Sequence, residues 1–124
     1  MKFYKCAICG NIISEVEARG GQIVCCGQPI TELVAKSSEL AFEKHVPVVV
    51  VEGNVVTVTV GSVPHPMLPE HHINWVAIQT TLGNQRKVLD PTKPAVVQFS
   101  LLPGEKIIRA LEYCNLHGLW EVVL

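Results

Sequence analysis

Cysteine and histidine are the residues of this 124-residue chain whose number and spacing could do chemistry, with five of each. Four thiols lie close to the amino terminus, at Cys6, Cys9, Cys25 and Cys26. The two-residue step in Cys6-Ala7-Ile8-Cys9 lets two sulfurs chelate one ion from a single turn, and Gly10 and Gly27 permit the tight backbone that such a site needs. Tetrahedral sulfur coordination suits zinc or iron, and the residue types alone do not choose between them. A structural zinc knuckle is therefore an alternative to an iron site.

The remaining cysteine and four of the histidines form a second candidate set: His45, His65, His71, Cys114 and His117. Imidazoles combined with one thiolate suit iron. Four imidazoles in a plane, with the thiolate on one axis, leave the opposite axis open, and an axial thiolate pushes electron density toward whatever binds there. The donor set thus predicts an electron-rich ferrous site that is open to small oxygen species.

Two other interpretations of these residues stay open. In one, the chain is a non-catalytic electron-transfer protein that uses the four-cysteine centre. In the other, the first site holds structural zinc, and Cys114 is a thiol nucleophile with His117 as its base. The second interpretation leaves the other three histidines of the second set without a role.

β-Strands are expected to position these donors. The chain is 48% hydrophobic and 17% charged, and its many valines favour strands. The pair Gly53-Asn54 between two valine-rich runs predicts a hairpin, whose ends would bring His45 and His65 side by side. About seven strands, with no convincing amphipathic helix, predict an immunoglobulin-like antiparallel β-sandwich. The expected strands are Val46–Val51, Val55–Val60, Trp75–Thr81, Lys87–Leu89, Ala95–Phe99, Lys106–Tyr113 and Leu119–Val123, with a turn at Gly83-Asn84.

The distribution of the donors predicts two domains, residues 1–36 and 37–124, with the boundary in the polar stretch Thr31–Glu39. A unit as small as residues 1–36 cannot bury enough apolar surface to offset its chain entropy, so it needs a metal or disulfides. The cysteines must supply that stabilisation.

The charge of the chain excludes some classes of partner. Ten Lys plus Arg against eleven Asp plus Glu give a net charge of -1. Binding to nucleic acid or to an anionic membrane needs a clustered excess of Lys and Arg, which this chain lacks. The longest apolar runs, such as Val46–Val51, are far below the roughly 18 residues of a membrane span. We therefore expect a cytoplasmic protein, in a reducing compartment where clustered cysteines are more often metal ligands than disulfides.

Both donor sets resemble those of one known family. The stretch Phe3-Tyr4-Lys5-Cys6 and the closing Cys25-Cys26-Gly27 resemble the desulforedoxin module, a dimeric relative of rubredoxin that holds one iron in four thiolates. Glu43-Lys44-His45, His65-Pro66-Met67 with His71, and Cys114-Asn115-Leu116-His117-Gly118-Leu119-Trp120 resemble the neelaredoxin or superoxide reductase domain. The entire chain is thus similar to the desulfoferrodoxin family.

The resemblance implies a mainly β protein with a small desulforedoxin-like metal knuckle ahead of the sandwich, two non-haem irons per chain and a homodimer. It assigns the second iron to four histidines and an axial cysteine, which are His45, His65, His71, His117 and Cys114 here. The implied reaction is the one-electron reduction of superoxide to hydrogen peroxide, after which a small electron carrier such as rubredoxin reduces the iron again.

Two residues next to His45 gain a role from the same resemblance. Lys44 is a cation that would attract superoxide and hydrogen-bond the product, and Glu43 a carboxylate that would occupy the open position once the iron is ferric.

The stretch from Leu68 to His72 departs from the family pattern, since Leu68-Pro69 replaces a more acidic pair and Glu70-His71-His72 replaces a Lys-His-Tyr-like stretch. His72 is therefore a rival ligand. Spacing favours His71, and adjacent side chains of an extended segment point to opposite faces. We expect His72 to be a strand or surface residue.

Overall fold

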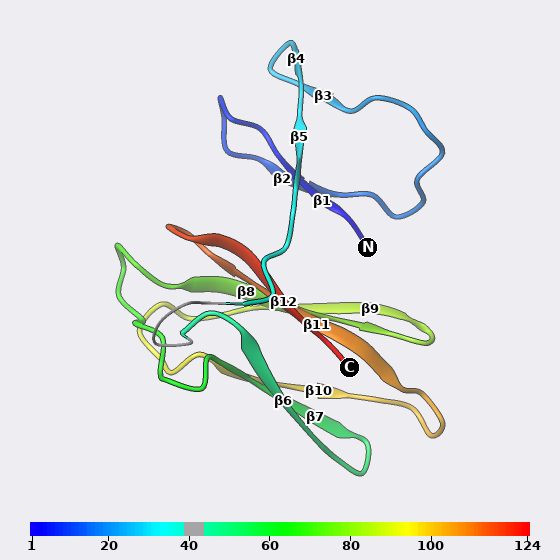
Figure 1. The fold of residues 1–124 in the computed structure, drawn as a ribbon, viewed down its shortest axis with the longest axis vertical. Helices are drawn as coiled ribbons and strands as arrows, with labels where there is room; N and C mark the ends of the chain where they lie inside the picture. Colours follow the sequence, from blue (N-terminus) through cyan, green and yellow to red (C-terminus); the bar gives the residue numbers. More distant parts are fainter. Residues whose placement is uncertain (39–43) are drawn as a thin grey trace. The chain divides into compact units, whose positions relative to one another are not determined.

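The computed structural model describes residues 1–38 and 44–124. These residues form β-strands and connecting turns, and none of them belongs to a helix that is long and apolar enough to cross a membrane. The chain divides into two compact units, Met1–Val34 and Ala35–Leu124 (Figure 1).

The first unit contains five short strands. β1 (Phe3–Lys5) pairs with β2 (Ile12–Ser14) on one side and with β5 (Thr31–Leu33) on the other. β3 (Val24–Cys25) and β4 (Gln28–Pro29) form a separate hairpin. The beginning of the polar stretch that we expected to hold the domain boundary therefore forms β5. Its polar residues are tolerated because this strand is largely exposed.

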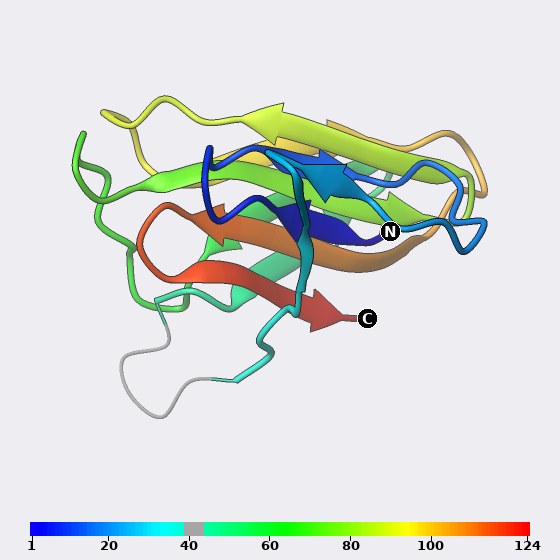
Figure 2. The same ribbon diagram turned by 90° about the horizontal axis from the view of Figure 1, so that it is seen from above.

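The second unit is an antiparallel sandwich, which confirms the predicted fold class. Its strands are β6 (Pro47–Glu52), β7 (Val55–Val60), β8 (Ile73–Thr80), β9 (Gly83–Val88), β10 (Val96–Ser100), β11 (Ile107–Cys114) and β12 (Gly118–Val123). One sheet has the order β10-β7-β6, and the other has the order β12-β11-β8-β9 (Figure 1). The four strands of the second sheet lie side by side in that order in Figure 2.

The core of the sandwich comes from side chains that alternate along the strands. Val56, Val58 and Val60 of β7 are fully buried, because a period of two turns every second residue toward the opposite sheet. Phe99 of β10 and Ile78 of β8 are also fully buried in this cluster. Burying one such side chain contributes about 1.5–3 kcal/mol, so this unit can hold its fold by packing.

The predicted turn at Gly83-Asn84 is wrong. The β8–β9 hairpin turns at Thr81 and Leu82, and β9 begins at Gly83, well before the expected start of that strand. β9 is an edge strand with mostly exposed side chains. Polar residues fill it, so the apolar alternation that reveals other strands is missing here.

Candidate metal centres

The four amino-terminal cysteines converge in the first unit. One sulfur from each lies within 4.8 Å of all the others, and Cys9 Sγ is 3.5 Å from Cys25 Sγ. A tetrahedral site with metal–sulfur bonds of about 2.3 Å has sulfur–sulfur edges of about 3.8 Å. The set therefore has the dimensions of a site for one tetrahedral metal ion.

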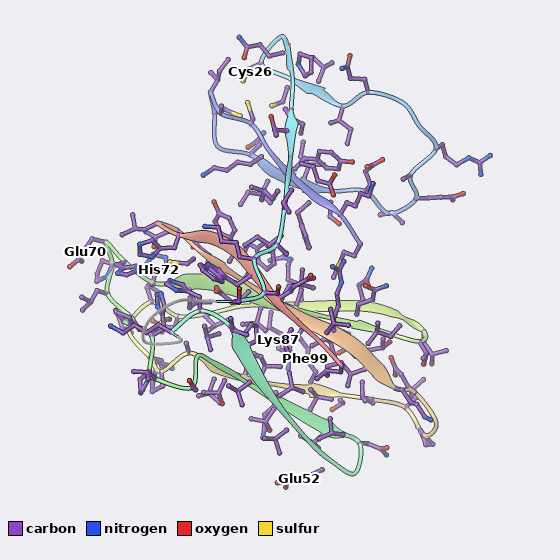
Figure 3. All side chains as sticks on the ribbon, viewed as in Figure 1. Cys26, Glu52, Glu70, His72, Lys87 and Phe99 are labelled. Carbon is purple, nitrogen blue, oxygen red and sulfur yellow. The ribbon has the colours of Figure 1, made fainter. Side chains whose placement is uncertain are left out.

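Backbone geometry brings these sulfurs together. The first knuckle closes with a hydrogen bond from Gly10 N to Cys6 O of 2.9 Å, and Gly10 has a φ of 80°. The second knuckle places Cys26 at a φ of 52°, a left-handed conformation that non-glycine residues seldom adopt. Such strain persists only where the surroundings impose it, and it often marks a functional site. Cys26 lies in the β3–β4 turn of this unit (Figure 3).

The thiols of the first site influence one another's protonation. Backbone N–H groups of Cys9 and Ile8 lower the pKa of Cys6 to about 6, which favours a thiolate. Hydrogen bonds to Cys9 and Cys6 raise the pKa of Cys25 to about 12, which favours a thiol. A metal requires all four sulfurs as thiolates, so its binding must release protons.

The second donor set lies at one end of the sandwich. His45 precedes β6 and His65 follows β7, and the register of these two strands pairs Pro47 with Val60. In the other sheet, Cys114 at the end of β11 pairs with both Ile73 and Gly118. This register brings together the residues that flank β8 and β12, His71 and His117. Each sheet therefore contributes donors to the same end.

The four imidazoles form a closed ring of neighbours. Going round from His45 through His65, His71 and His117 and back to His45, adjacent ring centroids are 4.7, 4.8, 5.0 and 4.8 Å apart. The interplanar angles of these pairs lie between 70° and 81°. Rings arranged in this way direct one nitrogen each toward a common centre.

The size of this ring fits a metal ion. His45 Nε2 lies 3.1 Å from both His65 Nε2 and His117 Nδ1. A square with edges of 3.1 Å has its centre about 2.2 Å from each corner, close to a metal–imidazole bond. His71 Nε2 is buried and has no hydrogen-bond partner among the described residues. A metal at the centre would use the lone pair that this atom otherwise leaves unsatisfied.

Cys114 provides the one thiolate of this set. Its Sγ is 3.7 Å from His117 Nδ1, and the residue is fully buried. Burial raises the pKa of this thiol, while the backbone N–H groups of Leu116 and His117 and the charge of Lys36 act in the opposite direction. The raised pKa means that the thiolate needs a cation beside it to be stable at neutral pH.

His65 shows how a surrounding carbonyl orients a candidate ligand. Its Nδ1 donates a hydrogen bond of 2.7 Å to Pro66 O, which leaves Nε2 unprotonated and facing the other imidazoles. Burial lowers the pKa of His65 to about 4, although the carbonyl opposes this shift. The ring is therefore neutral and able to bind a metal at pH 7.

The two adjacent histidines of the 68–72 stretch differ in position. His71 belongs to the ring of imidazoles. His72 Nδ1 hydrogen-bonds Leu68 O at 2.9 Å on the exposed side of the loop, and Figure 3 labels it beside Glu70. His72 is not part of either donor cluster among the described residues.

Of the two residues expected to assist catalysis, the structure describes one. Lys44 is half-buried and directly precedes His45. Its carbonyl oxygen would lie 2.5 Å from a Cβ added to Gly61. Only a glycine at position 61 therefore lets the backbone at Lys44 lie so close. Glu43 lies outside the described residues.

Trp120 and Lys36 are neighbours of this site that we did not predict. The Trp120 ring stacks on His45 at a centroid distance of 4.7 Å, and its Nε1 donates to His117 O at 3.2 Å. Lys36 Nζ lies 4.9 Å from the centroid of the Trp120 ring and donates to the same carbonyl at 3.2 Å. The contacts of Trp120 with His45 and of Lys36 with Trp120 and His117 join segments that are distant in sequence, and no local spacing signals them.

Four imidazoles and one thiolate at the end of a β-sandwich, preceded in the sequence by a four-cysteine knuckle, define a class of small proteins with two candidate metal sites. Residues 37–123 match the family Desulfoferrodoxin, and residues 1–33 match the family Desulfoferrodoxin, N-terminal domain. The chain belongs to the desulfoferrodoxin family.

Two relatives match nearly the whole chain, and a third matches about two thirds of it. A desulfoferrodoxin homolog of Archaeoglobus fulgidus is 45% identical over 98% of this chain and 95% of its own. The crystal structure of the superoxide reductase from Treponema pallidum is similar with a TM-score of 0.84 and 34% identity, and the match covers 98% of this chain and 96% of that one. A superoxide reductase of Pyrococcus horikoshii is 39% identical and matches 69% of this chain and 90% of its own.

Proposed function

We propose that this chain is a superoxide reductase, which adds one electron and two protons to superoxide and releases hydrogen peroxide. The observation that carries the proposal is the gathering of His45, His65, His71, His117 and Cys114 within 4.8 Å at one end of the sandwich. A solved structure named superoxide reductase has this fold, and a relative of the same name is 39% identical in sequence.

The five donors are proposed to hold one non-haem iron. Bound there, ferrous iron supplies the electron for superoxide. The thiolate of Cys114 adds electron density to the site, and the neutral imidazoles contribute no charge of their own. The bond from His65 to Pro66 O and the stacking of Trp120 on His45 keep two of the rings in place.

Lys44 and Glu43 are proposed to act on substrate and product. The ammonium group of Lys44 attracts the small anion to a site that its neighbour His45 helps to form, and water near Lys44 supplies the protons. Glu43 is the proposed carboxylate that closes the site after turnover.

A second iron is proposed for Cys6, Cys9, Cys25 and Cys26, with zinc as the competing metal. The distances among the sulfurs suit either ion. Metal analysis together with a visible spectrum distinguishes them, because a ferric four-thiolate centre is strongly coloured and a zinc one is colourless.

The test of the proposed function is stoichiometric. When the iron-loaded, reduced protein receives superoxide in pulses, each superoxide should oxidise one iron of the histidine and cysteine site and yield peroxide without dioxygen. Consumption of superoxide without oxidation of that iron would contradict the proposal. Cys114→Ser should abolish the activity, whereas a protein that only transfers electrons through its four-cysteine centre would keep its function in this variant.

Three further parts of the proposal concern the surroundings of the protein. A rubredoxin-like carrier is the proposed donor that restores the ferrous state. The chain is proposed to form a homodimer, for which the exposed Val48 and Val50 on the edge strand β6 offer apolar surface. A cytoplasmic location is proposed because the five cysteines form no disulfide and gather instead in the two candidate metal sites. Sedimentation of the purified protein tests the dimer, and stopped-flow reduction by reduced rubredoxin tests the donor.

A further inference from the structure

Asn115 connects two segments that carry candidate ligands of the second site. It follows Cys114, and its hydrogen bonds reach the loop that contains His71. The side-chain Oδ1 accepts a bond of 2.9 Å from His72 N, and Nδ2 donates one of 3.0 Å to Glu70 O. A third bond, of 3.2 Å, runs from Asn115 N to His72 O.

These bonds surround His71. The Asn115 carboxamide hydrogen-bonds the backbone of Glu70, which precedes His71, and of His72, which follows it. The backbone on both sides of His71 is therefore held by the residue next to Cys114. The arrangement needs one donor and one acceptor at the end of a short side chain, and an asparagine has both. An aspartate has no donor for Glu70 O, and an alanine has neither group.

The loop from Leu68 to His71 is also held by hydrogen bonds within its own backbone. Leu68 and His71 exchange two backbone hydrogen bonds, of 2.9 and 3.1 Å, around Pro69 and Glu70. His72 Nδ1 hydrogen-bonds Leu68 O at 2.9 Å, on the exposed side. With the backbone tied at both ends, a rotation that exchanged His71 and His72 would break the bonds of Asn115 and of Leu68 together.

We propose that Asn115 is the positioning residue that selects His71 over His72 as the fourth imidazole and sets its place relative to Cys114. The inference rests on the proposed function, since it concerns the same metal site. Asn115 acts through the backbone of the His71 loop, and it contacts neither substrate nor metal. Groups of this kind around metal ligands typically contribute 10- to 100-fold to metal affinity.

The test uses the full chain with Asn115→Asp and Asn115→Ala. The matched controls are Asn84→Asp and Asn84→Ala, at an exposed position on β9. Ferrous iron is titrated against a competing chelator, and the visible spectrum and midpoint potential of the second site are recorded. We expect both Asn115 variants to bind iron 10- to 100-fold more weakly at this site, and both controls to match the original protein. Circular dichroism with thermal unfolding reports in each sample whether the sandwich is folded, and the four-cysteine centre reports whether the first unit is loaded with metal.

His72→Ala gives a second readout that a merely structural role for Asn115 would not change. In the original protein this substitution should leave the spectrum of the second site unchanged, while in the Asn115→Ala background it should alter it, because His72 then competes for the metal. Equal iron affinity and an unchanged spectrum in the Asn115 variants would overturn the inference. A change caused by His72→Ala in the original protein would also overturn it. Absence of iron at the second site of the original protein would instead refute the proposed function.

Discussion

At the scale of single residues, Lys44 is the side chain whose charge matters most to the proposed reaction. Superoxide is an anion, and a cation beside an open site raises its local concentration and its association rate by 10- to 1,000-fold. Lys44→Ala should therefore lower the second-order rate constant with superoxide by at least about tenfold at low salt. The loss should shrink at about 0.1 M salt and above, where the Debye length falls to about 10 Å. Pulse radiolysis at several salt concentrations measures this constant.

Lys106 provides the matched control for Lys44. Its side chain is exposed, and its backbone carbonyl oxygen accepts a hydrogen bond from Thr81 N in the turn after β8. This turn lies at the opposite end of β8 from His71. Lys106→Ala should leave the rate constant unchanged. An equal loss in both variants would mean that only the net charge of the chain matters.

At the scale of elements, the end of β7 and the segment before β6 meet at Gly61. This residue has a φ of 81°, and a Cβ there would lie 2.5 Å from the carbonyl oxygens of Lys44 and Val63. Gly61→Ala should therefore combine backbone strain with a clash, and displace His45 from the ring of imidazoles. We expect it to lower the unfolding free energy by about 1–3 kcal/mol for the strain and by about 1–3 kcal/mol more for the overlap. Iron at the second site should be weakened or lost.

Gly104 separates the two effects. Its φ of 84° is almost the same, but a Cβ there would have no atom within 4 Å. Gly104→Ala should show only the cost of the strain, and should keep the second iron. Denaturant unfolding with metal analysis compares the two variants. Similar stability and iron content in both variants would show that the close approach of Gly61 to the Lys44 carbonyl does not affect folding or metal binding.

A second prediction at this scale concerns the turns at the far end of the sandwich. Glu105 accepts hydrogen bonds from the hydroxyl of Thr80 and, at 2.9 Å, from Leu102 N, and these bonds hold the pKa of Glu105 below its usual range. The folded chain thus binds this proton less readily than the unfolded chain. The stabilisation is present above the usual glutamate pKa of about 4.3, and is lost as the pH falls through the lower value of the folded state.

Glu105→Gln should therefore lower Tm at pH 7, and the difference from the original protein should shrink as the pH falls below the usual glutamate pKa of about 4.3. Glu52→Gln, at the exposed end of β6 (labelled in Figure 3), is the control and should leave Tm nearly unchanged. Thermal unfolding followed at several pH values measures both effects. A difference for Glu105→Gln that persists in acid would rule out the carboxylate as its source.

At the scale of the whole molecule, the two units are stabilised by different means. In residues 1–34, all of which the structure describes, only Phe3 and Cys6 are buried, whereas the sandwich has a continuous apolar core. A unit with so little buried surface depends on its metal to fold. Removing the metal with a chelator should therefore unfold the first unit, and leave the sandwich with a cooperative thermal transition.

Hydrogen exchange measures this difference unit by unit. After metal removal, amides of β1, β2 and β5 should lose their protection, and those of β8 and β11 should keep it. Cys9→Ser should have the same effect on the first unit without any chelator. Continued protection of β1 in the metal-free protein would show that the apolar contacts of this unit are sufficient.

Local pattern was enough to predict a large part of this molecule. The two-residue step between Cys6 and Cys9, the valine-rich hairpin and the return of His65 to the side of His45 all depend on residues close in sequence or joined by one turn. Such features follow from chain geometry and strand periodicity, which a sequence carries directly. The polar edge strand β9 was misplaced because its side chains are exposed on both faces, so no periodic apolar signal marks it.

The tertiary structure decided how the donors of the two sheets meet and which neighbours hold them. His45 reaches Trp120 and His117, and the loop of His71 reaches Asn115, only because strands far apart in the chain end on the same side of the sandwich. The sequence by itself determined which side chains can bind metal. Their distances and the contact between Gly61 and Lys44 arise from packing between distant segments, which no local spacing encodes.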